Sequence, residues 1–462
     1  MPDTVLSPAV RDEIARLGKA DIMVGIPSFK NAATIGYVVR AAQAGLVQYF
    51  PDLHPVVVNS DAGSPDGTSR VVIETEPPDY VEKILLVRPT NRLERVSLTY
   101  PEIDGVGGKG AALRTIFEIA AALEVEALVV VDSDLRSIVP EWIELLAGPI
   151  LKGGYDFTAP LYSRYKFDGT ITNTVTYPLT RALYGHRIRQ PIGGDFGVSG
   201  DLIRHYLALD DWTEDVSKFG IDIWMTTSAL AGGFAVCQTR LGAKVHDPKD
   251  PGADLGPMFR QVVGTILRLA ERYDERWLDI RGSHDVPAYG FERIIDPPPL
   301  EVNTLRLLSE FHAGSLTLVD AWRSMLSPES VETVLELAAE AGHLGDHARA
   351  KLGIGGDVAS TSATTLEMAD AVSEFYFPDD LWARVVYDLV LAARDPKPSL
   401  ETMVAALVPI YFGRVGSFVI ENRNVTTDQA EERVERQARE FELLKPYLVD
   451  RWRTQDAEAS GA

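Results

Sequence analysis

Cysteine is almost absent from this sequence: among 462 residues, Cys237 is the single example. One cysteine excludes an intrachain disulfide and any zinc site built from several cysteines, and it is typical of proteins in a reducing compartment. Basic residues are also scarce, with 45 Lys and Arg against 67 Asp and Glu and a formal net charge of −22. So acidic a chain is not expected to bind nucleic acid or an anionic membrane, although a local basic site can still hold a small phosphate compound.

Long hydrophobic runs and targeting signals are also lacking. The stretch 119–131 reads as the most apolar in the chain, but Glu124 and Glu126 interrupt it, so it falls short of the roughly 20 residues that span a membrane. Residues 1–20 carry scattered acidic side chains and no apolar core, unlike a secretory signal. We therefore expect a cytoplasmic protein without a membrane partner. The length predicts two or three domains.

Short β-branched runs alternate with amphipathic helices between residues 21 and 241. Continuous apolar strands that alternate with helices are typical of a parallel sheet covered on both faces, so the predicted fold class is α/β and Rossmann-like. In such sheets, ligands bind beyond the carboxyl ends of the strands. The predicted strands are 22–27, 55–61, 83–89 and 127–134, and the helices between them include 31–50 and 107–123.

Strand signals disappear after about residue 257, and the remainder reads as helical. We expect this part to supply a homodimer surface or to close over the active site, and both roles are open. Helices are predicted over 258–273, 302–327, 328–352, 365–393, 399–420 and 426–452. The predicted domains are an N-terminal helix at 1–19, an α/β catalytic domain at 20–289, a helical C-terminal region at 290–452 and a flexible tail at 453–462.

The strongest chemical signal is Asp132-Ser133-Asp134, which directly follows the apolar run ALVVV. Two carboxylates at the end of a buried strand are unfavourable unless positive charge offsets them. A hard divalent cation prefers carboxylate oxygens and can also bridge the oxygens of a diphosphate. A helix cap is the alternative, because Asp134 precedes a helix predicted to begin near Val139.

Two further segments have the composition of nucleotide-binding loops. NSDAGSPDGT at 59–68 places Asp61 at a strand end, where its carboxylate can accept hydrogen bonds from a base. A well-formed turn is the alternative. GGKG at 107–110 precedes a helix, where backbone N–H groups and Lys109 can contact phosphate or ribose. It lacks the spacing of a P-loop, and a solvent-exposed loop is the alternative.

Together these segments resemble the glycosyltransferases of the GT-A fold that use nucleotide sugars. The resemblance covers about residues 20–255 and is weaker in the helical remainder. Within this fold, the chain is most similar to the retaining enzymes that make glucosylglycerate, mannosylglycerate or their 3-phosphoglycerate precursors. The matching segments are PSFKN at 27–31, NSDAGSPDGT at 59–68, GGKG at 107–110, DSD at 132–134, PIGGD at 191–195, GID at 220–222 and AKVHD at 243–247.

The resemblance implies a role for each matching residue. Asp134 and His246 would bind a divalent metal, Mg²⁺ or Mn²⁺. Asp195 would take hydroxyls of the transferred sugar and Asp222 would lie near the acceptor, which makes these two the catalytic candidates. Related enzymes usually carry Glu at the position of Asp195, so the preference for sugar or acceptor stays open. The nucleotide-sugar site would comprise Pro27, Ser28, Asn31, Asp61, Gly108, Lys109, Asp132, Ser133, Gly193 and Gly194.

The acceptor site is implied by a separate stretch. Arg164 in LYSRYKFDGT and Thr172 in GTITNT occupy the segment that binds the glycerate carboxylate in this group. Arginine suits a carboxylate or phosphate because it binds in a bidentate manner. Arg187 and Arg189 are further candidates, and each of the three arginines can instead be a surface charge.

The implied reaction moves a hexosyl group from a nucleotide diphosphate sugar to D-glycerate with retention of configuration. Glucose is favoured over mannose, and the donors are GDP-, UDP- or ADP-glucose or GDP-mannose. Transfer to 3-phosphoglycerate is one alternative. Another is an inverting family 2-type enzyme with a saccharide acceptor and Asp222 as its general base. A third is a nucleotide-sugar-binding protein without catalysis.

Overall fold

The computed structural model describes residues 4–75, 82–86, 108–245, 255–292, 297–354 and 363–461. The chain divides into two compact units, each built from separated stretches. A cut near residue 290 is predicted from the sequence pattern, whereas here residues from both sides of that point belong to each unit. The first unit is Met1–Ser163, Ile188–Asp247 and Asp285–Pro297, and the second is Arg164–Arg187, Pro248–His284 and Pro298–Ala462.

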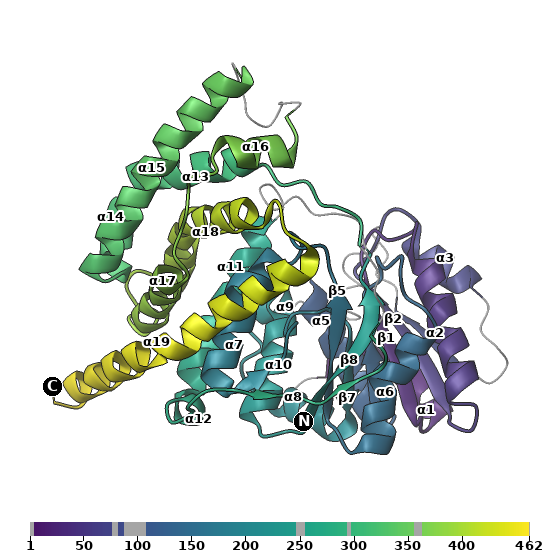
Figure 1. The fold of residues 1–462 in the computed structure, drawn as a ribbon. Coiled ribbons are helices and arrows are strands. Elements are labelled where there is room, and N and C mark those ends of the chain that lie inside the picture. Colours follow the sequence, from purple (N-terminus) through teal and green to yellow (C-terminus); the bar gives the residue numbers. More distant parts are fainter. Residues whose placement is uncertain are drawn as a thin grey trace. The chain divides into compact units, whose positions relative to one another are not determined.

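A mixed sheet of eight strands forms the centre of the first unit (Figure 1). Its strands are β1 (Ile22–Ser28), β2 (Pro55–Asp61), β3 (Glu82–Leu86), β4 (Ala127–Val130), β5 (Phe157–Ser163), β7 (Phe196–Ser199), β8 (Val236–Ala243) and β10 (Ala288–Tyr289). The strand order is β10-β8-β5-β7-β4-β1-β2-β3. Strand β7 runs antiparallel to β4 and β5, and the other neighbours are parallel. The predicted strands correspond to β1, β2, β3 and β4.

Helices cover both faces of this sheet, which explains why β1 and β2 are buried along their whole length. On one face, Val24 and Val129 join an apolar core with helices α2 and α6, whereas α5 packs on β1 and β2. The α/β class predicted from the sequence is confirmed. The helices of this unit are α1 (Pro8–Leu17), α2 (Ile35–Tyr49), α3 (Thr68–Glu74), α5 (Lys109–Ala122), α6 (Glu141–Gly153), α8 (Gly200–Ala208), α9 (Glu214–Ser217) and α10 (Ile221–Ala231).

The second unit is mainly helical. Its elements are η1 (Thr172–Thr176), α7 (Tyr177–Tyr184), α11 (Leu255–Arg272), α12 (Asp274–Trp277), α13 (Thr304–Thr317), α14 (Val319–Met325), α15 (Pro328–Leu352), α16 (Thr365–Ala371), α17 (Asp379–Ala392), α18 (Leu400–Asn422) and α19 (Thr427–Gly461). A short sheet pairs β6 (His186–Arg187) with β9 (His284–Asp285). Helix α15 shows how the sequence sets the ends: the Ser327 hydroxyl caps its start, Pro328 follows, and Gly353 ends it in a left-handed conformation.

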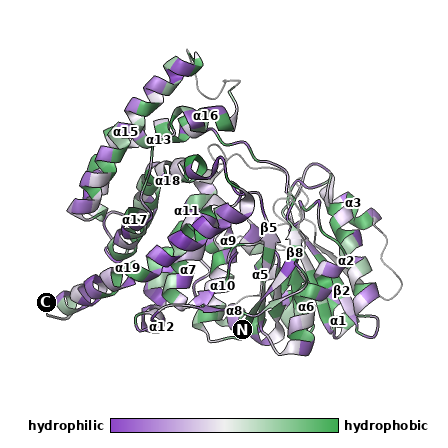
Figure 2. Ribbon diagram, in the orientation of Figure 1, coloured by the Kyte–Doolittle hydropathy of each residue, from purple (hydrophilic) through white to green (hydrophobic). Residues whose placement is uncertain are grey.

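Several helical predictions differ from the structure in detail. The predicted helix 302–327 is divided into α13 and α14, and 365–393 is divided into α16 and α17. Helix α19 continues to Gly461, through most of the stretch predicted as a tail. Figure 2 shows that α15 and α19 carry both hydrophilic and hydrophobic residues.

Helix α18 is the most apolar long helix among the described residues. The sequence pattern instead predicts 119–131 as the most apolar stretch and does not single out α18. It is long and apolar enough to cross a membrane by composition, and 83% of its most apolar stretch is buried in the structure. That burial is expected of a core helix in a helical unit.

Candidate active site

The strand ends of the first unit meet at one edge of the sheet. Strands β1, β2, β4 and β8 run in the same direction, so their carboxyl ends share an edge, and the loop before the antiparallel β7 lies at that edge too (Figure 1). Ligands of such sheets bind there. The edge carries Pro27 and Ser28 on β1, Asp61 on β2, Asp132, Ser133 and Asp134 after β4, and Gly193, Gly194 and Asp195 before β7.

Asp132 lies between two lysines at this edge. Its Oδ1 is 2.9 Å from Lys109 Nζ and its Oδ2 is 2.8 Å from Lys244 Nζ. Burial alone would raise the pKa of Asp132, but the two ammonium groups lower it far below its ordinary value. Asp132 is therefore a fixed anion that organises both lysines.

Asp195 is fully buried and already has partners for both oxygens. Its Oδ1 accepts the Asp132 backbone N–H at 2.8 Å, and its Oδ2 accepts Lys244 Nζ at 2.8 Å and the Tyr162 hydroxyl. Burial raises the pKa of Asp195, and Lys244 opposes that shift. In this structure the carboxylate holds the loop before β7 in place and has no oxygen exposed to a sugar hydroxyl.

Asp222 lies in the first turn of α10 and faces Lys109, the first residue of α5. Lys109 Nζ is 3.0 Å from Oδ1 and 3.1 Å from Oδ2 of Asp222. Burial would lower the pKa of Lys109, but Asp132 and Asp222 raise it above its ordinary value. Burial raises the pKa of Asp222, with Lys109 opposing. Three carboxylates (Asp132, Asp195 and Asp222) thus share two lysines (Lys109 and Lys244). Because acidic groups outnumber basic ones in this cluster, it can accept a further cation without excess positive charge.

Asp134 differs from these acids because it is partly exposed and has no hydrogen bond or ion pair with any residue that the structure describes. It is not a helix cap, since α6 begins well beyond it with Pro140 at the cap position. An unpaired carboxylate beside a strand end fits a hard divalent cation. His246, its predicted co-ligand, lies outside the described residues. Within the described ranges, no group of three or more His, Cys, Asp or Glu side chains forms a metal site.

Asp61 is fully buried and is hydrogen-bonded to serine residues on the surrounding loops. Its oxygens accept the hydroxyls of Ser28, Ser64 and Ser69 at 3.0, 2.6 and 2.7 Å, and also the Ser64 backbone N–H at 3.0 Å. A base that bonded to this carboxylate would have to replace one of these donors. The structure therefore gives Asp61 a role in shaping the loop.

Asn31 and Ser133 connect the ends of β1 and β4. The Ser133 hydroxyl donates to Asn31 Oδ1 at 2.8 Å, and the Thr34 hydroxyl donates to the Ser133 carbonyl at 2.8 Å. The backbone N–H of Asn31 donates to the Thr68 hydroxyl at 2.8 Å. These bonds hold two predicted nucleotide-site loops together.

The glycines at the start of α5 allow another helix to pack closely against it. A Cβ atom on Gly110 would lie 1.8 Å from the Val216 carbonyl oxygen, and one on Gly108 would lie 2.6 Å from the Ser217 carbonyl oxygen. Helix α9 therefore rests directly on the start of α5, and the glycine spacing is explained without a ligand. Gly107 lies outside the described residues.

The predicted acceptor residues are divided between the units: Arg164, Thr172 and Arg187 belong to the second unit, whereas Arg189 and Asp222 belong to the first. Arg164 Nη1 is 3.2 Å from Asp168 Oδ2, and Thr172 is buried at the start of the π-helix η1. Such π-helical turns are frequent at functional sites. Arg187 donates from Nε to the Ser283 hydroxyl at 2.9 Å, and the backbone N–H of Arg189 donates to Gln238 Oε1 at 2.8 Å.

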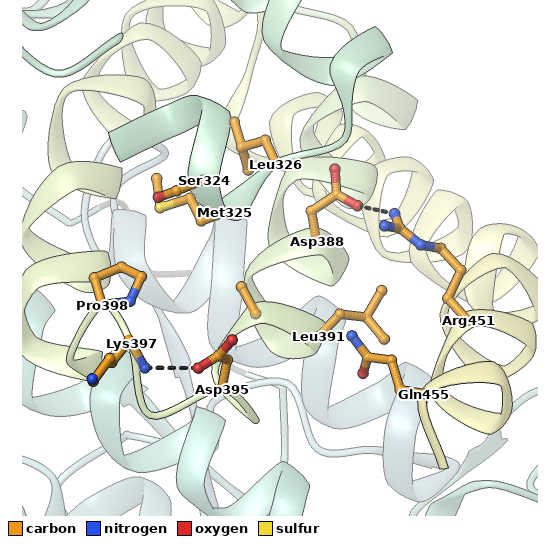
Figure 3. A pocket seen from close by; sticks show the side chains of 11 residues that line it. Ser324, Met325, Leu326, Asp388, Leu391, Asp395, Lys397, Pro398, Arg451 and Gln455 are labelled. Carbon is orange, nitrogen blue, oxygen red and sulfur yellow. Dashed lines mark hydrogen bonds and ion pairs between the residues drawn. The ribbon is translucent and has the colours of Figure 1, made fainter. Parts of the chain in front are cut away.

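A pocket of about 200 Å³ in the second unit contains none of the predicted site residues (Figure 3). It lies between α14, α17, α19 and the loop after α17. Its buried acid, Asp388, accepts from Ser327 N, the Ser330 hydroxyl, the Tyr447 hydroxyl and Arg451 Nη1, at 2.9, 2.9, 2.5 and 2.7 Å. These bonds join α15, α17 and α19, so this wall of the pocket serves the helical packing.

Lys244 and Tyr162 are site residues that were not predicted from the sequence. Lys244 stands two positions before His246 in the segment AKVHD, and the signal that could have found it was a lysine directly after an apolar strand. Tyr162 lies on β5, where it reads as an ordinary strand residue. Its hydrogen bond to Asp195 depends on strand order, which no local pattern contains.

Comparison with known proteins gives one sequence relative. No protein-family model matches the chain. The glucosyl-3-phosphoglycerate synthase of Petrotoga mobilis is 24% identical over 271 residues, covering 55% of this chain and 75% of the relative.

The solved structures that resemble this chain include complexes of a protein with the same name as this relative. Glucosyl-3-phosphoglycerate synthase from Mycobacterium tuberculosis, in complex with Mn²⁺, UDP-glucose and phosphoglyceric acid, is 25% identical, with coverage of 56% and 84% and a TM-score of 0.42. Its complex with Mg²⁺ and UDP is 25% identical, with coverage of 56% and 83% and a TM-score of 0.42. The resemblance predicted from the sequence is confirmed by the relative from Petrotoga mobilis: the chain is similar to the synthases of glucosyl-3-phosphoglycerate.

Proposed function

We propose that this chain is a metal-dependent glycosyltransferase that moves a hexosyl group from a nucleotide diphosphate sugar to a glycerate-type acceptor. Glucose is the favoured sugar, and D-glycerate and 3-phosphoglycerate are the two acceptors to compare. The observation that carries the proposal is the convergence at the carboxyl edge of the sheet of Lys109, Asp132 and Asp134, of which Asp134 has no partner among the described residues. The similarity to a glucosyl-3-phosphoglycerate synthase supports the choice of acceptor class.

The residues at this edge suit a nucleotide diphosphate. Lys109 begins α5, where the positive end of the helix dipole and an ammonium group both attract phosphate. Asp134, with His246, would hold the divalent cation, which when bound would neutralise negative charge on the departing diphosphate. Asp132 holds Lys109 in place through an ion pair of 2.9 Å.

Retention of configuration is the stereochemical outcome that we propose. An inverting enzyme needs a free general base near the acceptor hydroxyl. Both oxygens of Asp222, the candidate for that base, lie within 3.1 Å of Lys109 Nζ. This pairing supports a retaining reaction, in which the acceptor attacks from the face of the leaving group and the diphosphate takes its proton. We also propose that the enzyme is a cytoplasmic homodimer.

A donor–acceptor grid tests the proposal. The purified protein is supplied with Mg²⁺ or Mn²⁺, and UDP-, GDP- and ADP-glucose and GDP-mannose are each offered to D-glycerate and 3-phosphoglycerate. We expect release of nucleoside diphosphate that depends on one of the two acceptors and is abolished by EDTA. NMR of the product is expected to show the anomeric configuration of the donor. Release without acceptor dependence would overturn the acceptor class, and an inverted product would favour the inverting alternative.

A further inference from the structure

Lys244 is the more enclosed of the two lysines at the candidate site. It follows β8 directly, and its side chain is 4% exposed. Its ammonium group lies 2.8 Å from each of three oxygens: Asp132 Oδ2, Asp195 Oδ2 and the Gly193 carbonyl. An ammonium group has three N–H donors, so these acceptors use all of them. A phosphate could reach Lys244 only by displacing a buried protein oxygen.

Lys109 differs from Lys244 in its exposure and in its partners. Its side chain is 14% exposed, and its ion-pair partners among the described residues are two carboxylates, Asp132 and Asp222. It stands at the start of α5, where an anionic ligand is favoured. When Lys109 turns to a ligand, Asp132 keeps its second ion pair, with Lys244, and so does not become an uncompensated buried charge.

The loop before β7 is built onto the Lys244 ion pair. Gly194 has a φ of +91°, and a Cβ atom at this position would lie 2.2 Å from Asp132 Oδ2 and 2.9 Å from Lys244 Nζ. The neighbouring Asp195 is fixed to Lys244 and to the Asp132 backbone. The loop that is predicted to face the transferred sugar therefore takes its position from Lys244.

We propose that the two lysines have different roles at the site. Lys244 is a positioning residue that fixes Asp132 and the loop 193–195 without touching the donor, whereas Lys109 exchanges Asp132 for the donor diphosphate and keeps its pairing with Asp222. This inference rests on the proposed function. It adds a residue role that depends on ion-pair geometry and not on the identity of the sugar or the acceptor.

The test is a double-mutant cycle on Lys244 and Asp195, with Lys109→Met beside it. Lys244→Met leaves Asp132 and Asp195 without their shared cation, so we expect a lower melting temperature and a kcat reduced by about 100-fold through misplacement, with donor KM changed by less than about threefold. Adding Asp195→Asn removes one unpaired charge, and we expect it to restore kcat by about tenfold and part of the melting temperature. Lys109→Met is expected to raise donor KM by about tenfold or more and to leave the melting temperature closer to that of the wild type.

Matched variants keep the result interpretable. Lys244→Arg keeps the charge and is expected to fold and retain more activity than Lys244→Met. Lys19→Met, which removes an exposed ion pair with Glu124, is the control and is expected to match the wild type. A Lys244→Met enzyme with normal stability and a donor KM raised as in Lys109→Met would overturn the proposal, as would a double variant no better than the single one. If the wild type transfers no sugar, the proposed function fails, whereas the coupling in melting temperature still tests the link between Lys244 and Asp195.

Discussion

The two units of this chain bury charge in different ways. In the first unit, Lys109 and Lys244 are shared among three carboxylates, two on loops at the edge of the sheet and one, Asp222, in the first turn of α10. In the second unit, Arg414 on α18 is 2.6 Å from Asp379 on α17 and 2.9 Å from Glu421. Arg181 on α7 binds both oxygens of Glu442 on α19, at 3.0 and 3.1 Å.

This difference separates a site from a scaffold. An arginine fork fixes its carboxylate through two directed bonds, and a buried pair of this kind holds helices in one arrangement. A lysine is a point charge on a flexible stem and can change partner. A shared lysine cluster beside Asp134, a carboxylate with no partner in the described part of the chain, can therefore reorganise around a ligand, whereas the arginine pairs cannot.

The largest expected effect comes from breaking the site alone. Asp134→Asn removes the negative charge that is proposed to bind the metal, so we expect kcat to fall by at least about 100-fold. Because Asp134 has no partner among the described residues, the melting temperature should not change. The control is Asp12→Asn on the exposed surface of α1, which should leave both quantities at the wild-type value. Retained turnover in Asp134→Asn would remove the metal assignment.

Breaking a buried arginine pair of the second unit should have the opposite result, which is a loss of stability. Arg414→Met leaves Asp379 buried without this partner, and we expect the free energy of unfolding to fall by about 3–5 kcal/mol. The matched control is Arg453→Met, which removes an ion pair with Asp279 whose side chains are 52% and 88% exposed, and should cost less than about 1 kcal/mol. Denaturant unfolding followed by circular dichroism measures both. A loss no larger than that of the control would contradict the scaffold role.

A smaller effect is expected at the backbone contact beside Lys109. Gly110→Ala would place a methyl group 1.8 Å from the Val216 carbonyl oxygen, so α5 and α9 must separate. We expect a loss of about 1–3 kcal/mol in unfolding free energy. Gly345→Ala is the matched change in helix α15, where a Cβ atom meets nothing within 4 Å, and it should stabilise by about 0.5–1 kcal/mol. Equal effects of the two substitutions in thermal unfolding would show that the contact is unimportant.

The smallest effect concerns a lysine of the scaffold. Lys445 donates to the carbonyl oxygens of Ile280 and Leu183 at 3.0 and 3.2 Å. Burial and the charge of Arg281 lower the pKa of Lys445 to about 7, although Glu442 and Asp279 oppose the shift. The unfolded chain keeps its proton to a higher pH than the folded chain, so stability should rise as the pH increases above 7 and fall as it decreases through 7.

The measurement compares the wild type with Lys445→Met between pH 7 and pH 9. We expect the wild type to gain about 1–2 kcal/mol relative to the variant over this range. The exposed Lys351→Met is the control and should follow the wild type. A difference between Lys445→Met and the wild type that is constant with pH would rule out a lowered pKa.

The fold class was predictable because it depends on local pattern. The buried strands β1, β2 and β4 are continuous apolar runs, and the helices between them have apolar residues at helical spacing. The antiparallel β7 and the division into interleaved units were not predictable in this way, because both depend on which distant segments pair. Helix α18 was overlooked as an apolar segment because Arg414 and Pro409 interrupt its composition, although the helix is continuous.

The candidate site was predictable in outline for the same reason. Polar residues after apolar strands identified the positions of Asp61, Asp132 and Asp134. Their environments were not predictable, since the hydrogen bonds that surround Asp61 and Asp195 come from residues on other loops. Lys244 was missed because its partner Asp132 is far away in the sequence and approaches only through the strand order.

The most direct test of the account is the location of a bound metal. Crystals grown with Mn²⁺ and a nucleoside diphosphate would be measured at a wavelength where manganese scatters anomalously. We expect a peak beside the Asp134 carboxylate at the carboxyl edge of the sheet, with the diphosphate next to Lys109. A peak at another place in the molecule, or a diphosphate bound to Lys244 in place of Lys109, would contradict it.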